Sequence, residues 1–282
     1  MRIVIICFLL TVCNPLAAQH SITSRNGVQI ITSGGKAADS VFIDLVGDPN
    51  AQVVFIPTAA SLLRLPNDSS GVIWNPDEEK NKKEFKDQLL KRFKLNELTI
   101  LHTRKRDEAN TESFVAPLHK AKAVWISGGN PGRFMSTYQG TLLEKELRAF
   151  LKRGGIIAGE SAGAIVQGSY TVRGNPEKPV LMVEGSEKGL GLLQNVAINP
   201  HLSDQKRENE LVTVIDKYPF LLGIGIDDNA GLLIRNGIGE VFGQGRIAIY
   251  DNKQYKGGWY YWLKPGDKFD FEKKLPVNFL PK

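Results

Sequence analysis

Five short apolar runs most constrain how this chain folds, because each is apolar almost throughout rather than alternating with polar residues. They are GVQIITSGG (27–35), QVVFIPTAAS (52–61), LTILHT (98–103), AVWISGGN (123–130) and GGIIAGESAG (154–163). Such runs are typical of strands that are buried on both faces. Segments with helical spacing of apolar residues separate them, notably at 77–94 and 137–155. This alternation predicts an α/β fold with a mostly parallel sheet and helices on both faces.

The last third of the chain has a different pattern. The segments LLGIGID, AGLLIRNGIGEVFGQGRIAIYD and GGWYYWLKPG are short β-rich stretches separated by Asn-Gly and glycine-rich turns. We therefore expect C-terminal short β-strands in addition to the parallel sheet. The run WYYW (259–262) fits a strand with aromatic side chains on both faces better than a carbohydrate-stacking platform.

The first twenty residues, MRIVIICFLLTVCNPLAAQH, have the pattern of an export signal. A cation near the start is followed by a short apolar core and then by small residues, which predicts cleavage after residue 18. The apolar core is shorter than the roughly 20 residues that a spanning helix needs. We expect residues 19–282 to form a single domain that is exported, either periplasmic or secreted. A lipid anchor on Cys13 is the alternative.

Composition excludes several kinds of site. Both cysteines, Cys7 and Cys13, lie in the predicted signal, so the remaining chain has no disulfide, thiolate zinc ligand or cysteine nucleophile. Without Arg2 the chain has 35 cationic against 30 acidic side chains, a net charge of +5, and the two signs are mixed along the sequence. That mixture is typical of a solvated surface. We expect no nucleic-acid partner, no membrane contact after signal cleavage, no metal and no cofactor.

The fifth apolar run contains Gly159-Glu160-Ser161-Ala162-Gly163, which fits the pattern Gly-x-Ser-x-Gly. Small neighbours allow a sharp, strained turn between a strand and a helix, and such a turn presents the serine hydroxyl above the sheet. The N–H of Ala162 can then face an oxyanion. The motif alone equally describes a structural turn, since glycine and serine are common turn residues.

A serine nucleophile needs a base and an acid that orients the base. His201 is the only histidine after Ser161, and it follows the apolar stretch LLQNVAI, as expected of a base at a strand end. Three glutamates, Glu177, Glu184 and Glu187, lie between Ser161 and His201, and spacing does not choose among them.

A second oxyanion donor is expected from the end of the run AVWISGGN. The backbone of Gly128 or Gly129 can approach a ligand closely because neither residue has a side chain. The same segment also fits a plain helix entry, with Asn130 as the cap and Pro131 in the first turn. Both readings can hold at once.

These blocks together resemble the S51 serine peptidases, the family of cyanophycinases and related aspartyl dipeptidases. The matching blocks are SGG after the fourth apolar run, GESAGA, GLGLL…H, GIGIDDNAGLLI and GEVFGQGRIAIYD, and they extend from about residue 27 to residue 251. The resemblance implies a fold similar to class I glutamine amidotransferases, a peptide or isopeptide substrate similar to cyanophycin, and by analogy a homodimer. It also implies the following roles: Ser161, His201 and Glu177 catalytic, with Glu184 as the alternative acid; Gly129 and Ala162 in the oxyanion hole; Asn130, Asn199 and Arg207 in substrate binding.

The recognition residues depart from the cyanophycinase pattern. Where cyanophycinases have Asp-Gln after the Gly-Gly pair and again before the base, this chain has Asn130-Pro131 and Asn199-Pro200. Of their two arginines after the base, only Arg207 has a counterpart here. Because buried polar pairing discriminates strongly between substrates, these changes predict altered specificity. We expect an exported serine peptidase that hydrolyses aspartyl or β-aspartyl linkages by a Ser-His-Glu triad. The alternatives are an S51-like binding protein without catalysis and an α/β-hydrolase esterase.

Overall fold

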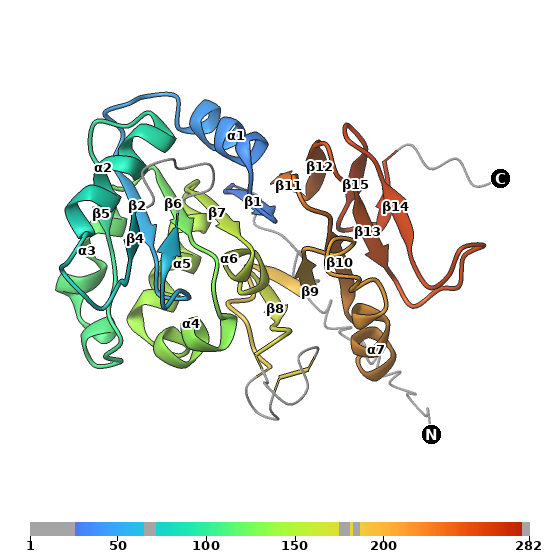
Figure 1. Cartoon of the computed structure of the whole chain (residues 1–282). Coiled ribbons are helices and arrows are strands. Elements are labelled where there is room, and N and C mark those ends of the chain that lie inside the picture. Colours follow the sequence, from blue (N-terminus) through green and yellow to red (C-terminus); the bar gives the residue numbers. More distant parts are fainter. Residues whose placement is uncertain (1–25, 65–71, 175–180, 183–186, 278–282) are drawn as a thin grey trace, which may run out of the picture.

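The computed structural model describes residues 26–64, 72–174, 181–182 and 187–277, and in this part of the chain two β-sheets account for most strands (Figure 1). The larger sheet has nine strands in the order β16-β15-β12-β11-β1-β7-β6-β2-β5. Its strands are β1 (Val28–Thr32), β2 (Val53–Ile56), β5 (Thr99–Ile100), β6 (Ala123–Ile126), β7 (Ile156–Glu160), β11 (Ala230–Arg235), β12 (Ile238–Gly243), β15 (Lys268–Asp270) and β16 (Leu275–Pro276). A separate short hairpin joins β3 (Leu63–Arg64) to β4 (Ile73–Trp74).

The larger sheet is parallel in one half and antiparallel in the other. Strands β1, β7, β6, β2 and β5 pair in parallel, whereas β11, β12, β15 and β16 continue the sheet from β1 in antiparallel fashion. The five parallel strands are the five apolar runs of the sequence, so that prediction is confirmed. Their carboxyl ends lie at one edge, which is where open α/β sheets bind ligands.

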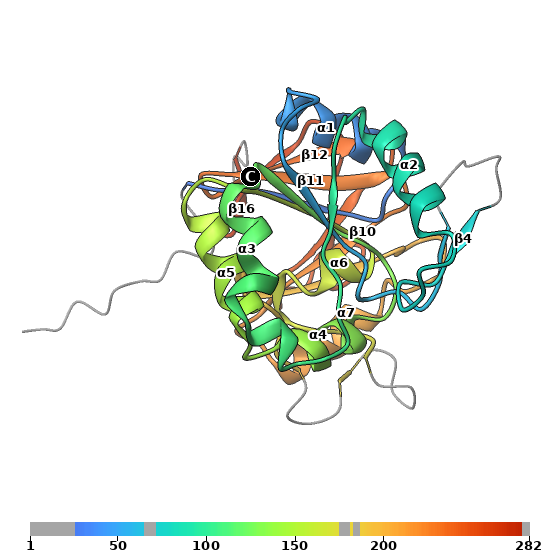
Figure 2. The same ribbon diagram turned by 90° about the vertical axis from the view of Figure 1, so that its left-hand side faces the viewer.

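Helices cover both faces of the parallel half, as predicted (Figure 2). They are α1 (Lys36–Val46), α2 (Lys82–Phe93), the 3₁₀ turn η1 (Glu108–Asn110), α3 (Glu112–Lys120), α4 (Pro131–Tyr138) and α5 (Leu142–Lys152). Alternate residues of each strand enter two cores: Val53 and Phe55 pack with α1 and α2, whereas Val54 and Ile56 pack with α3, α4 and α5. This division follows from the period of two in a strand, which sends successive side chains to opposite faces.

The smaller sheet stands beside the larger one and has the order β14-β13-β10-β9-β8. Its strands are β8 (Gly168–Tyr170), β9 (Leu193–Pro200), β10 (Leu222–Ile226), β13 (Ile247–Tyr250) and β14 (Tyr261–Leu263), and α7 (Glu210–Lys217) packs on one face. Its other face shares an apolar core with β1, β11 and β12 of the larger sheet. The short helix α6 (Ala162–Ile165) lies between the two sheets, in contact with β7 and β9.

The C-terminal strands are therefore divided between the sheets rather than forming a separate unit. Strands β11, β12, β15 and β16 extend the larger sheet, and β13 and β14 complete the smaller one. In the aromatic run, Tyr260 and Trp262 pack with the α7 side and Tyr261 packs with the inter-sheet core, as expected of a strand.

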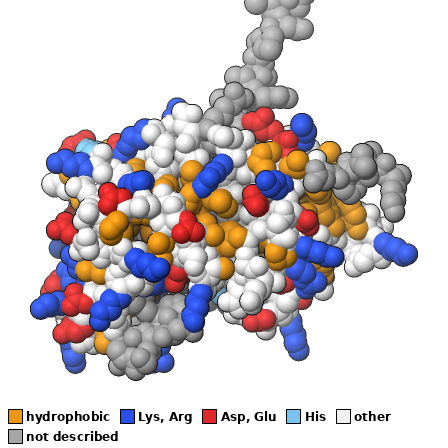
Figure 3. Space-filling model, turned by 90° about the horizontal axis from the view of Figure 1, so that it is seen from above, with side chains coloured by type: hydrophobic (Ala, Val, Ile, Leu, Met, Phe, Trp, Pro, Cys, Tyr) orange, Lys and Arg blue, Asp and Glu red, His pale blue; other side chains and the backbone are white. Residues whose placement is uncertain are grey.

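Figure 3 shows cationic and anionic side chains interspersed over one face of the molecule. Among the helices that the structure describes, none has the length and apolar character that crossing a membrane would need. The predicted signal, residues 1–18, lies outside the described residues, so its cleavage and the lipid anchor on Cys13 stay predictions.

Candidate active site

Ser161 lies in the turn between β7 and α6, at the carboxyl edge of the parallel strands. Its backbone is in a strained region for a residue with a side chain, with φ 52° and ψ −113°. The flanking glycines make the turn sterically feasible. A Cβ at Gly159 would lie 2.1 Å from the carbonyl oxygen of Gly163, and a Cβ at Gly163 would lie 2.2 Å from that of Ile126. The Gly-x-Ser-x-Gly spacing is thus required by the turn itself.

His201 reaches Ser161 from the other sheet. It directly follows β9, and its Nε2 lies 3.1 Å from Oγ of Ser161. Its Nδ1 lies 2.5 Å from Oδ1 of Asp228, which follows β10. An ionised carboxylate only accepts hydrogen bonds, so Nδ1 carries the proton and donates to Asp228. Nε2 then accepts the hydroxyl proton of Ser161, which is the protonation pattern that a general base requires.

The strand pairing explains why Asp228 reaches His201. Strands β9 and β10 are parallel neighbours, with Pro200 in register with Ile226. Residues that follow the two strands therefore leave the sheet at the same edge and the same level. The repeated acid in GIGIDDNAG was the available signal, but the sequence argument sought the acid only between the serine and the histidine.

The glutamates expected to orient the base, Glu177 and Glu184, lie outside the described residues. Their role stays a prediction, and among the described residues Asp228 is the carboxylate bonded to the imidazole. Its neighbour Asp227 accepts hydrogen bonds from Ser203, in the segment after β9, and from Arg246, directly before β13.

A pocket of about 400 Å³ opens above these groups. It is lined by Ser33, Gly34, Gly35, Gly128, Glu160, Ser161, His201, Asp204, Asp228 and Asn229. Its ionisable side chains are one histidine and three carboxylates, with no lysine or arginine among these lining residues. Hydrogen bonding to Asp228 and the charge of that carboxylate raise the pKa of Asp204. A separate pocket beside α7, of about 350 Å³, includes no serine or histidine in its described lining.

The predicted oxyanion donors flank the serine. Gly128 packs against Ser161, since a Cβ built there would lie 3.2 Å from Cβ of Ser161 and 3.7 Å from its Oγ. Gly129 has φ 136°, a conformation that favours glycine, and a Cβ at this position would meet the carbonyl oxygen of Ala59 at 2.3 Å. Among the described residues, the backbone N–H groups of Gly129 and Ala162 have no recorded hydrogen-bond partner, so both can donate to a ligand.

The residues expected to bind substrate have other contacts in this structure. Asn130 caps α4 as predicted, its Oδ1 accepting from the N–H of Arg133 at 3.1 Å. Asn199 is 1% exposed, and its amide donates to Glu210 at 2.9 Å. Arg207 donates to the carbonyl of Pro200, immediately before the base, at 3.1 Å. Burial and then the nearby charge of Arg173 lower the pKa of the Arg207 guanidinium.

Glu160, directly before the nucleophile, belongs to a buried ionic group that the sequence reasoning missed. Arg92 of α2 donates to Glu160 at 2.8 Å and to both carboxylate oxygens of Asp39 in α1. Burial alone would lower the pKa of Arg92, but the two carboxylates outweigh it and raise that pKa. The guanidinium also lies over the ring of Trp125, 4.9 Å from its centroid. This group anchors the strand end that leads into the nucleophile turn.

The described residues contain no group of three or more histidine, cysteine, aspartate or glutamate side chains placed to hold a metal ion.

Comparisons with known proteins identify relatives of this chain. The model of peptidase family S51 matches residues 29–241. A cyanophycinase of Nostoc sp. is 30% identical over 156 residues, which cover 54% of this chain and 52% of that protein. A cyanophycinase of Synechococcus elongatus is 31% identical over 161 residues, which cover 56% of this chain and 50% of that protein. The matches thus span about half the length of these curated relatives.

A solved structure of a peptidase from an acI-B1 Actinobacterium is similar with a TM-score of 0.66, over 88% of this chain and 99% of that one. The two are 24% identical, so this likeness speaks for the fold alone. It agrees with the expected α/β fold. Since the family model covers well over half of the sequence, this chain belongs to peptidase family S51.

Proposed function

We propose that the chain is a serine peptidase that hydrolyses peptide or isopeptide bonds next to aspartyl residues, with Ser161, His201 and Asp228 as its triad. The observation that carries the proposal is the continuous chain of contacts from Oγ of Ser161 through the imidazole to Asp228. In this proposed triad, Asp228 orients the imidazole, which is the role that the sequence led us to expect of a glutamate.

The reaction follows from the protonation pattern. Oγ of Ser161 attacks the scissile carbonyl carbon while Nε2 of His201 takes the hydroxyl proton, and the N–H groups of Gly129 and Ala162 stabilise the oxyanion. As the C–N bond breaks, His201 gives its proton to the leaving amine, which leaves an acyl group on Ser161. A water molecule then attacks the acyl carbon, and its proton passes through His201 back to Ser161 as the acid product leaves. Asp228 stabilises the imidazolium in both halves.

The substrate class rests on the relatives and on the charge of the pocket. The matched relatives are cyanophycinases, and the pocket is lined by Glu160, which is paired with Arg92, and by Asp204 and Asp228, with no lysine or arginine among its described lining residues. A substrate with a cationic group near the scissile bond, as in an aspartyl–arginine linkage, suits that charge. The altered pairs Asn130-Pro131 and Asn199-Pro200 lead us to expect a preference that differs from that of cyanophycinases. We also propose that the protein is exported, on the pattern of its first 18 residues.

The test uses purified protein incubated with cyanophycin and with paired α- and β-aspartyl peptides, and products are read by mass spectrometry. Ser161→Ala is the inactive variant, and Ser136→Ala on the exposed face of α4 is the matched control. We expect wild type and Ser136→Ala to cleave at least one peptide and Ser161→Ala to cleave none. No cleavage by wild type, together with no labelling by a fluorophosphonate, would favour a binding protein. Cleavage of short acyl esters alone would favour an esterase.

A further inference from the structure

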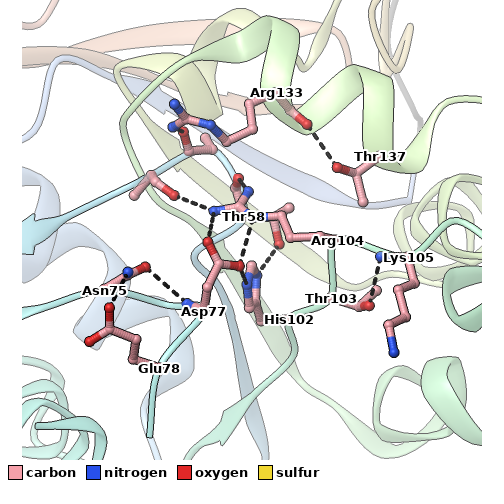
Figure 4. A network of polar contacts seen from close by, with 12 residues as sticks. Thr58, Asn75, Asp77, Glu78, His102, Thr103, Arg104, Lys105, Arg133 and Thr137 are labelled. Atoms are coloured by element: carbon pink, nitrogen blue, oxygen red, sulfur yellow. Dashed lines mark hydrogen bonds and ion pairs between the residues drawn. The ribbon is translucent and has the colours of Figure 1, made fainter. Parts of the chain in front are cut away.

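A polar network outside the catalytic pocket holds the turn that follows β2 (Figure 4). Three successive backbone carbonyls of this turn accept from arginine side chains. Arg104 donates to the carbonyls of Thr58 and Ala60, the second at 2.7 Å, and Arg133 donates to that of Ala59 at 2.8 Å. Two guanidinium groups therefore fix the path of three consecutive residues.

Arg104 is itself held by Asp77 and His102. Its Nε lies 2.8 Å from Oδ1 of Asp77, and Nε2 of His102 lies 3.0 Å from the same oxygen. Nδ1 of His102 lies 2.8 Å from Oγ1 of Thr58, which also lies 2.6 Å from the hydroxyl of Tyr138. With its proton on Nε2, His102 donates to Asp77 and its Nδ1 accepts from the Thr58 hydroxyl. The Thr58 hydroxyl in turn accepts from the Tyr138 hydroxyl. A neutral imidazole thus satisfies every contact in the chain.

The ionisation of the network matches this arrangement. Burial, together with the charge of Arg104, lowers the pKa of His102 and so favours the neutral ring, although the hydrogen bond that His102 donates to Asp77 acts in the opposite direction. Burial alone would raise the pKa of Asp77, but hydrogen bonds from Arg104 and His102 outweigh it and lower that pKa. Asp77 is therefore an anion facing Arg104 at neutral pH.

The turn held by this network contacts the expected oxyanion hole directly. The carbonyl of Ala59 accepts from the N–H of Asn130 at 2.8 Å. Gly129 passes so close to the same carbonyl that a Cβ on it would lie 2.3 Å from the oxygen. The adjacent Gly128 packs against Ser161. A displacement of Ala59 would therefore displace the Gly128–Asn130 segment relative to the nucleophile.

We propose that Arg104, held by Asp77 and His102, is a positioning residue for the backbone donor at Gly129 in the oxyanion hole. The inference rests on the proposed function for its catalytic consequence. Arg104 does not line the pocket at Ser161 among the described residues, and it acts through the Thr58–Ala60 turn. The position of the Gly129 N–H controls the rate, because its hydrogen bond must point at the oxygen on which negative charge develops in the transition state.

The chain offers a closely matched control two residues away. Arg106 donates to three backbone carbonyls, those of Ser136, Thr137 and Gln139 at the end of α4, whereas Arg104 donates to two, those of Thr58 and Ala60. Arg104→Ala and Arg106→Ala therefore remove the same type of side chain together with its backbone contacts, and Arg104→Ala also removes the ion pair with Asp77. Only the first removes contacts to the turn beside Gly129. A general loss of stability would affect both variants, whereas a positioning role affects Arg104→Ala alone.

The first measurement is amide hydrogen exchange of the full chain. In Arg104→Ala we expect the Asn130 amide, which bonds to Ala59, to exchange at least about 10-fold faster than in wild type and in Arg106→Ala, because local opening of the turn exposes it. Equal exchange in both variants would overturn the proposal. This readout does not depend on any activity, so it stays decisive if the proposed hydrolysis is not found.

The second measurement is kinetic. We expect Arg104→Ala to lower kcat and the rate of fluorophosphonate labelling of Ser161 by about 10-fold or more, with KM within about 2-fold of wild type, since displaced donors weaken the transition state. Added guanidinium ion should restore part of the rate, because the Arg104 side chain is 28% exposed and its site is reachable. Unchanged labelling in folded Arg104→Ala would overturn the inference, whereas absent labelling in wild type would overturn the proposed function.

Discussion

Replacing Asp228 by asparagine tests the acid of the proposed triad. The change keeps the size of the side chain but removes the charge that faces Nδ1 of His201 at 2.5 Å. An amide can donate to Nδ1, which would leave the proton on Nε2, where it cannot accept from Ser161. In the serine-protease template the same change lowers kcat by about 10⁴. Asp228 is 26% exposed, so water replaces part of its effect, and we expect a loss of about 10² to 10⁴.

The expected loss corresponds to about 3 to 5.5 kcal/mol of transition-state stabilisation, at about 1.4 kcal/mol for each factor of ten. Steady-state kcat and KM on the best aspartyl peptide, together with the fluorophosphonate labelling rate, measure it. Asp216→Asn is the control, because Asp216 is an exposed carboxylate that lines the separate pocket beside α7. Its effect should stay below about 10-fold. Near-wild-type kcat in Asp228→Asn, with a large loss in Glu177→Gln, would refute this assignment.

Three further predictions concern stability. Gly129→Ala places a Cβ against the carbonyl of Ala59 at a residue with φ 136°. It should lower the free energy of unfolding, measured in urea, by about 2 to 4 kcal/mol. An unchanged midpoint of urea unfolding would contradict this close approach. Arg92→Met leaves Asp39 and Glu160 without their buried cation and should cost about 3 kcal/mol, whereas a neutral effect would show that water replaces the ion pair. Because burial lowers the pKa of His102, the folded state binds fewer protons than the unfolded state, so stability should fall as pH drops below about 6.5. Thermal melts of His102→Gln should show a smaller fall over that range.

The parallel half of the sheet could be predicted from sequence because its strands are buried on both faces. Full burial leaves continuous apolar runs, and the connecting helices leave their own spacing. Ser161 could be identified for a related reason: its strained turn requires glycine on both sides, and that requirement is visible in the residue types. His201 could be found because few histidines are available.

The acid could not be found in the same way. Asp228 reaches the imidazole because β10 pairs in parallel with β9, and pairing between strands in a second sheet leaves no mark at fixed sequence spacing. The buried contact of Glu160 with Arg92 escaped notice for a similar reason, since 68 residues separate the partners. Asn199 was expected to face substrate, but Glu210 lies within hydrogen-bonding distance of its amide, a long-range contact that sequence does not reveal.

The division of the catalytic groups between two sheets has a consequence for biosynthesis. Ser161 is carried by the larger sheet, whereas His201 and Asp228 are carried by the smaller one. Contacts between residues so far apart in sequence form late, after loop-closure entropy has been overcome. On the proposed mechanism, a nascent or partly folded chain would therefore hold an unactivated serine, and hydrolytic competence would appear only when the two sheets dock. The architecture would thereby delay the proposed hydrolysis until the chain itself has little unfolded backbone left to cut.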